Sequence, residues 1–149
     1  MKQIVDMEKL EPSIREIVGA GGRVRLTVTG QSMMPTLCDK RDCVILEKPE
    51  KLKKQDIVLY QRSNGDYVLH RIVNVKNGKL ALCGDNQTMV EYPIEESQVI
   101  AVAGEIVRKG KTIPKNKFSY RFCAFFWTTF IPLRPIMFKY FVKIKNRFF

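Results

Sequence analysis

The spacing of apolar residues along the chain predicts a body built mainly of β-strands, with helices at its ends. Residues 3–18 have the apolar spacing of a helix in two pieces, with Pro12 suited to a first helical turn. Residues 23–29 alternate strictly between polar and apolar side chains, which is typical of a half-buried strand. Further strands are expected at residues 43–46, 57–60, 67–75, 80–83 and 98–107.

Two Asn-Gly dipeptides, at residues 64–65 and 77–78, separate three of these apolar runs. Asn-Gly between alternating runs is the strongest short-range signal for a β-hairpin. A three-stranded meander is therefore expected, with His70 on its middle strand. We expect the chain as a whole to be mainly β (α+β).

Charged and aromatic residues divide the chain into a neutral body and a cationic tail. Of 26 Lys and Arg residues, 11 lie in residues 106–149, where there is no Asp or Glu; 12 of the 15 aromatic residues also lie in the last 32 positions. We expect a helical segment over residues 1–22, a β-domain over 23–110 and a basic aromatic tail over 111–149. Two structures fit this tail. It is either an element that lies at an anionic membrane interface or a helix that packs on the body.

Targeting signals and metal motifs are not evident. The first residues have no apolar run with a cleavage site, so a cytoplasmic location, or a peripheral one at the inner membrane face, is expected. Four cysteines form no C-x-x-C pair and there is one histidine, so reduced thiols are expected, with no metal and no cofactor.

The turn after the first strand contains the candidate nucleophile. Its sequence is Gly30-Gln31-Ser32-Met33-Met34-Pro35-Thr36-Leu37. The glycine and proline around Ser32 favour a fixed turn in which the serine Oγ and its own N–H face one substrate carbonyl. The local pattern alone favours an ordinary polar turn.

This turn resembles the nucleophile box of type I signal peptidases, G-x-S-M-x-P-T-L, in the wider clan that includes LexA-like repressor proteases. Residues 54–60 are similar to the family's G-D-I-V-x-F strand, with Gln55 where glycine is usual. Residues 67–73 resemble its base-bearing strand, and residues 84–86 match its G-D-N box. The resemblance runs from residue 24 to about residue 107 and implies the signal peptidase/LexA-like β-fold, with supporting motif positions at Pro35, Asp56, Arg71, Gly84 and Asn86.

The resemblance implies that Ser32 is the nucleophile and His70 the general base. Members of this family carry lysine or histidine at the base position, and this chain is of the histidine kind. An ordinary imidazole pKa of about 6.5 leaves the ring neutral at pH 7 and able to accept the serine proton. Without the resemblance, a histidine between Val68 and Ile72 would be taken as a packed core residue.

Asp85 is the candidate for the third member of a Ser-His-Asp arrangement, in which it would orient the imidazole. Asp56 is a competing candidate. The alternative role for Asp85 is that of a turn residue capping backbone N–H groups.

The oxyanion and nucleophile turn, Gly30, Gln31, Ser32 and Met33, departs from the family pattern at Gly30. Many members carry a serine there, whose hydroxyl contributes to the oxyanion hole. The hole would instead use the Ser32 N–H and one more main-chain donor, at an expected cost of about 10²-fold in rate. The family's usual amino-terminal anchor is also absent from the pattern.

Together these features predict a serine endopeptidase of signal peptidase-like type that cleaves leader or signal segments after small residues. Its expected partners are a peptide or precursor protein and an anionic membrane surface. Nucleic acid is a less suitable partner, because phenylalanine dominates the aromatic residues of the tail. The alternative is a catalytically weak or inactive peptide- or membrane-binding module of the same fold.

Overall fold

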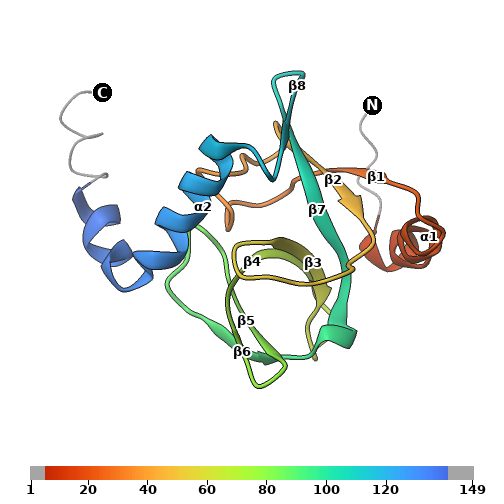
Figure 1. Ribbon diagram of the computed structural model, residues 1–149, viewed down its shortest axis with the longest axis horizontal. Coiled ribbons are helices and arrows are strands. Elements are labelled where there is room, and N and C mark those ends of the chain that lie inside the picture. The colour runs from red at the N-terminus through yellow and green to blue at the C-terminus, as the bar shows by residue number, and fades with distance from the viewer. Residues whose placement is uncertain (1–5, 141–149) are drawn as a thin grey trace.

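One antiparallel sheet of eight strands forms the centre of the chain in the computed structural model, which describes residues 6–140 (Figure 1). The strands are β1 (Val24–Thr27), β2 (Cys43–Glu47), β3 (Ile57–Gln61), β4 (Tyr67–Lys76), β5 (Lys79–Cys83), β6 (Glu91–Ile94), β7 (Val99–Arg108) and β8 (Lys111–Pro114). Their order across the sheet is β1-β2-β7-β3-β4-β5-β6, and β8 pairs with β7. The mainly β fold predicted from the apolar spacing is confirmed.

The meander β3-β4-β5 forms around the two Asn-Gly turns as predicted, with His70 on β4. At the second turn, Asn77 and Gly78 both have positive φ, at 53° and 71°, which is the backbone of the favoured two-residue hairpin turn. The turns therefore fix the register that places His70 opposite Val58.

Two short strands, β6 and β8, were not expected from the sequence. β6 contains Pro93 and β8 ends at Pro114, and proline argues against a strand because it cannot donate to the ladder. β6 lies at the edge of the sheet, and β8 forms a hairpin with the end of β7. The sheet consequently extends to residue 114, past residue 110, where the charge pattern placed the start of the tail.

Helix α1 (Met7–Gly19) is continuous, whereas the sequence pattern suggested two pieces within residues 3–18. Asp6 caps its start by accepting a hydrogen bond from the Glu8 N–H at 3.3 Å. Pro12 lies inside the helix and not in its first turn. The helix continues past Pro12 because Ile14 and Val18 on the following turns are buried against the sheet.

Two connections and one strand meet at one side of the sheet. The β1–β2 connection carries Ser32, the start of β4 carries His70, and the β5–β6 connection carries the G-D-N segment. Met33 and Leu37 of the first connection belong to the same apolar cluster as α1, β2 and β7. A second cluster fills the space enclosed by β3 to β7. The loops that carry the candidate chemistry are thus anchored on a packed core.

After β8 the chain forms α2 (Phe118–Thr129), the short helix η2 (Ile131–Leu133) and a helical segment over residues 134–140. These elements lie on the side of the molecule opposite α1 (Figure 1). In the part of the chain that the structure describes, no helix combines the length and apolar character needed to cross a bilayer. The predicted interface element also includes Lys143, Lys145 and Arg147, which lie outside the described residues.

Candidate active site

Ser32 lies in the β1–β2 connection, which buried side chains hold to the body. Met33 and Leu37, on the carboxyl side of Ser32, are buried in the apolar cluster beside α1. On the amino side, the Gly30 N–H donates to Asp39 Oδ1 at 2.9 Å. The turn that presents Ser32 is therefore fixed at both ends.

The G-D-N segment packs directly against this turn. The Asn86 N–H donates to the Ser32 carbonyl oxygen at 2.8 Å, and the Asn86 amide Nδ2 donates to the Gln31 carbonyl oxygen at 3.2 Å. Gly84 lies so close that a Cβ there would be 2.5 Å from the Ser32 carbonyl oxygen. Glycine and asparagine in this segment thus set the position of the nucleophile turn.

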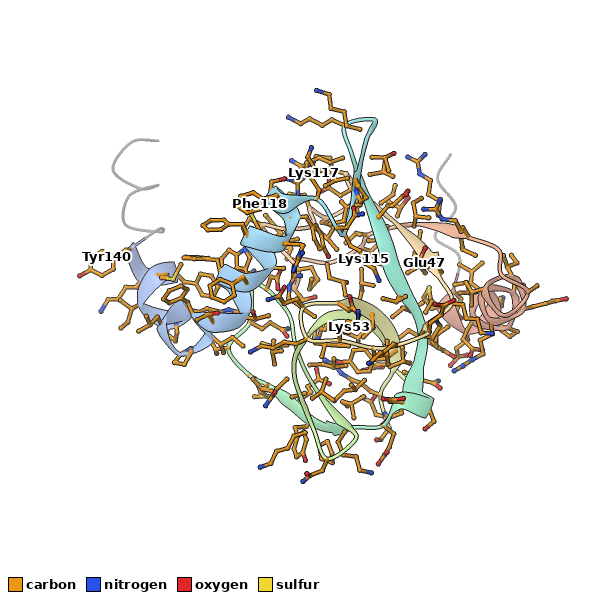
Figure 2. All side chains as sticks on the ribbon, in the orientation of Figure 1. Glu47, Lys53, Lys115, Lys117, Phe118 and Tyr140 are labelled. Atoms are coloured by element: carbon orange, nitrogen blue, oxygen red, sulfur yellow. The ribbon has the colours of Figure 1, made fainter. Side chains whose placement is uncertain are left out.

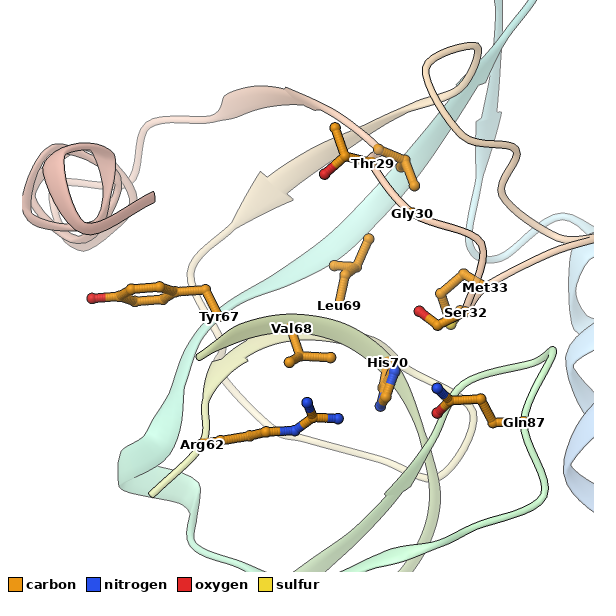
Figure 3. A pocket seen from close by; sticks show the side chains of 11 residues that line it. Thr29, Gly30, Ser32, Met33, Arg62, Tyr67, Val68, Leu69, His70 and Gln87 are labelled. Atoms are coloured by element: carbon orange, nitrogen blue, oxygen red, sulfur yellow. The ribbon is translucent and has the colours of Figure 1, made fainter. Parts of the chain in front are cut away.

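Ser32 and His70 line one cleft of about 250 Å³. One wall is formed by residues 28–30 after β1, and the other by residues 67–70 of β4; Figure 3 shows Ser32 and His70 facing the space between them. Within the described residues, no hydrogen bond joins the Ser32 hydroxyl to the imidazole. In serine hydrolases such a bond often tightens only when substrate is bound.

His70 is 1% exposed, and its ring is oriented by a tyrosine. Nδ1 lies 3.3 Å from the Tyr60 hydroxyl, which itself donates to Glu91 Oε2 at 2.9 Å. Because the Tyr60 proton is directed to Glu91, the phenol oxygen accepts a hydrogen bond from Nδ1–H. This assignment leaves Nε2 of His70 as the unprotonated nitrogen.

Glu91, the first residue of β6, places a carboxylate behind the imidazole. Its Oε1 lies 3.5 Å from His70 Nδ1, and Arg62 holds it through Nε at 3.0 Å from Oε2 and through a second bond to Oε1. A carboxylate at this side of the ring stabilises the positive charge that develops when Nε2 takes up a proton.

Burial decides the charge state of the ring. It lowers the pKa of His70 to about 4, an effect that Glu91 opposes and Arg62 reinforces. Burial alone would raise the pKa of Glu91, but the hydrogen bonds from Arg62 and Tyr60 outweigh it and hold that pKa below its usual value. Burial and the bond to Glu91 raise the pKa of Tyr60. At neutral pH the site therefore contains a neutral imidazole, a neutral phenol and an ionised Glu91.

Asp85 is bound to Arg71 and not to His70. The two carboxylate oxygens accept hydrogen bonds from Arg71 at 2.9 and 2.7 Å, both side chains are 0% exposed, and the Thr36 hydroxyl also donates to Asp85. With its oxygens occupied in this way, Asp85 makes no hydrogen bond to the imidazole. In the structure Tyr60 makes the contact that the sequence analysis assigned to Asp85.

Asp56 and Pro35, two other residues of the predicted motif set, do not line the cleft. Asp56 accepts a hydrogen bond from the Lys53 N–H at 3.0 Å in the turn before β3 and lies 3.7 Å from Lys115 Nζ. Pro35 is exposed in the β1–β2 connection. Arg71, besides binding Asp85, donates to the Gln55 carbonyl oxygen at 2.9 Å. The contacts of these residues hold the surrounding loops together.

The backbone around Ser32 supplies one donor for an oxyanion. Among the described residues, no hydrogen bond engages the Ser32 N–H. Gly30 has φ of +88°, in the left-handed region that favours glycine. A serine at this position, as the resemblance leads one to expect, would be strained in this turn.

Arg134 of the tail is completely buried against the β5–β6 connection. Its Nη1 donates to the carbonyl oxygens of Gly84 and Gln87 at 2.7 and 2.6 Å, and its Nη2 donates to that of Trp127. The guanidinium also lies 5.5 Å from the centre of the Trp127 ring. The tail is therefore attached to the loop that positions Ser32.

The sequence analysis did not single out Tyr60, Glu91 or Arg134 as site residues. The hairpin register offered a signal for Tyr60, because it pairs with Val68, two residues from His70 on the same strand. Glu91 had no such signal, since it comes from β6, which the apolar pattern does not predict. Arg134 had no signal either, since it lies in the tail, beyond the motif span that ends at about residue 107.

The mainly β fold agrees with the comparison with protein families. The chain matches the model of the family described as Peptidase S24-like over residues 3–107, a span that contains Ser32, His70 and the G-D-N segment. The chain belongs to this family, which confirms the resemblance at the level of the LexA/signal peptidase-like clan. No curated protein matches the chain significantly.

Proposed function

We propose that the chain is a serine endopeptidase that cleaves leader- or signal-like segments after small residues. One observation carries the proposal: Ser32 shares a cleft with an imidazole whose Nδ1 is hydrogen-bonded to Tyr60, so that Nε2 is left to accept a proton. Membership of the Peptidase S24-like family supports peptidase-type chemistry.

In the proposed mechanism, the Ser32 Oγ bonds to the scissile carbonyl carbon while its proton passes to His70 Nε2. The oxyanion that forms accepts a hydrogen bond from the Ser32 N–H. The C–N bond then breaks, and the imidazolium returns the proton to the leaving amine. A water molecule next attacks the acyl-serine ester with His70 again as base, which releases the new carboxylate and restores Ser32. Glu91 and Tyr60 stabilise the imidazolium in both halves.

The cleft suits an extended peptide. Strand β5 pairs with β4 only from Arg71 onward, so the edge of residues 67–70 is open towards the cleft. Residues 28–30 form the opposite wall. A peptide lying between the two segments would add a strand to the open edge, with main-chain hydrogen bonds giving affinity. The small volume of the cleft favours small side chains beside the scissile bond.

The proposal is tested by sequencing new amino termini by mass spectrometry. Membranes, cytosol and a proteome-derived peptide library are incubated with wild-type protein, Ser32→Ala or His70→Asn. Ser63→Ala is the matched control, because Ser63 is exposed in the β3–β4 turn, outside the cleft. We expect termini that appear with wild type and Ser63→Ala and vanish with both site variants.

If the samples give the same termini, the peptidase proposal is wrong and the chain is a binding module of this fold. If cleavage survives in His70→Asn but not in Ser32→Ala, the base is another group and the proposed mechanism fails. Where cleavage occurs, the residues before each cut define the specificity.

A further inference from the structure

The helices after β8 expose large apolar side chains along one side. The set is Phe118, Phe122, Phe125, Leu133, Ile136 and Tyr140, with exposed fractions from 47% to 82%. We call these residues the exposed apolar face. The phenylalanines of α2 are four and three positions apart, on one face of the helix, and the rings of Phe118 and Phe122 stack at 6.4 Å. Figure 2 shows Phe118 and Tyr140 directed away from the body.

The opposite side of these helices is already packed on the body. Tyr120 contacts the main core cluster, Ile131 packs against the cluster of β4 and β5, and Ala124 and Thr128 are buried. A surface helix with one packed apolar side normally presents a polar outer side to water. The exposed apolar face therefore needs a second apolar environment, which the described chain does not provide.

The charges around this face have a single sign. Lys117, Arg121 and Lys139 are exposed beside it, and no Asp or Glu occurs after Glu105. A protein surface that contacts only water normally carries both positive and negative side chains. A second copy of the chain would bring the same positive charge against it. Nucleic acid would match the charge, but Leu133 and Ile136 offer a base neither stacking nor a hydrogen bond.

A groove beside the Ser32 cleft reaches the helical segment that carries Ile136 and Tyr140. This groove of about 420 Å³ is bordered by Phe138 of the tail and by Met89, which is 77% exposed. Arg62 and Gln87 border both this groove and the cleft that contains Ser32. The helical segment over residues 134–140 therefore borders a groove that adjoins the cleft.

We propose that the exposed apolar face is a docking surface for a bilayer that contains anionic lipid. The aromatic rings enter the headgroup region, and the flanking cations bind lipid phosphates. Docking leaves the cleft entrance beside the membrane surface. This inference stands apart from the proposed peptidase activity, because it rests on the tail and not on Ser32 or His70.

The test is vesicle flotation with the full chain. The vesicles are phosphatidylcholine alone or phosphatidylcholine with phosphatidylglycerol at about 30 mol%. The variants are Phe118→Glu/Phe125→Glu, Lys117→Gln/Arg121→Gln and the matched control Val75→Glu, whose side chain is 41% exposed on β4. Ser32→Ala is included so that membrane binding and peptidase activity are scored separately.

We expect wild type, Val75→Glu and Ser32→Ala to float with the anionic vesicles and to dissociate at high salt. The phenylalanine variant should bind about tenfold more weakly or worse, and the cation variant should lose the preference for anionic lipid. If circular dichroism shows that Phe118→Glu/Phe125→Glu is unfolded, the result for Lys117→Gln/Arg121→Gln decides the outcome. Wild type that does not float, equal binding by wild type and the variants, or dimerisation or DNA binding without vesicle binding would each overturn the proposal.

Discussion

The buried imidazole of His70 takes up a proton less readily in the folded chain than in the unfolded one. Its pKa is about 4 when folded and about 6.5 when unfolded, so the unfolded state binds more protons between these values. The contribution of His70 to the free energy of unfolding should therefore be highest above pH 6.5, fall by about 3 kcal/mol towards pH 4 and level off below. Urea unfolding at several pH values measures this loss.

The matched variant for that measurement is His70→Gln, which removes the titrating ring. Protonation of carboxylates whose pKa is lowered, such as Asp42, also destabilises the protein in acid, and it does so in both proteins. The His70 contribution is the difference between the two pH profiles. Identical profiles would mean that burial does not shift the imidazole.

Glu91 is a positioning residue for His70 that the sequence did not indicate. Its charge opposes the lowering of the imidazole pKa, so Glu91→Gln should lower that pKa further and move the acid limb of kcat/KM to lower pH. We expect kcat to fall by about 10- to 100-fold, because the imidazolium loses its counter-charge. Tyr60→Phe should reduce kcat by a similar amount. A loss of activity with an unmoved acid limb would assign Glu91 a purely structural role.

At the scale of loops and strands, the Arg71–Asp85 pair holds the β5–β6 connection to β4. Both charges are fully buried, so Asp85→Asn leaves Arg71 without its counter-charge and should lower the free energy of unfolding by about 3–5 kcal/mol. Asp66→Asn, in an exposed turn, is the control. Denaturant titration checks the loss. If stability is unchanged while cleavage stops, Asp85 takes part in catalysis as the sequence analysis suggested.

Gly84 tests whether the G-D-N segment positions the nucleophile. In Gly84→Ala the new Cβ would meet the Ser32 carbonyl oxygen at 2.5 Å, so the turn must shift. A displacement of that kind should reduce kcat by about 10²-fold. Gly19→Ala is the control, because a Cβ there meets nothing within 4 Å. Unchanged turnover in Gly84→Ala would show that the turn is not held by this contact.

Local patterns predict the elements that carry Ser32 and His70, because period-two alternation and Asn-Gly turns act over a few residues. They do not predict β6, a four-residue strand with a proline, and so they miss Glu91. The family motif indicates Asp85 as the acidic partner of the histidine instead. Long-range strand pairing brings Glu91 to the histidine, and Arg71 binds the carboxylate of Asp85. Neither of these interactions leaves a local signal in the sequence.

At the scale of the whole molecule, Arg134 connects the tail to the site. Arg134→Met would leave the carbonyl oxygens of Gly84 and Gln87 without these donors, and we expect a loss of about 2–4 kcal/mol in unfolding free energy. Hydrogen exchange of residues 84–88 should become faster, and turnover should fall. Arg121→Met, on the exposed side of α2, is the control. Unaltered exchange in Arg134→Met would mean that the tail and the loop are independent.

The bonds from Arg134 to the Gly84 and Gln87 carbonyl oxygens also bear on how a substrate is chosen. Through the G-D-N segment they connect the tail helices to the Ser32 turn. If the tail rests on a bilayer, the nucleophile sits at a fixed height above the lipid. If the chain also cleaves peptides as proposed, the number of residues between a bond and the membrane then helps to select that bond, in addition to the side chains beside it.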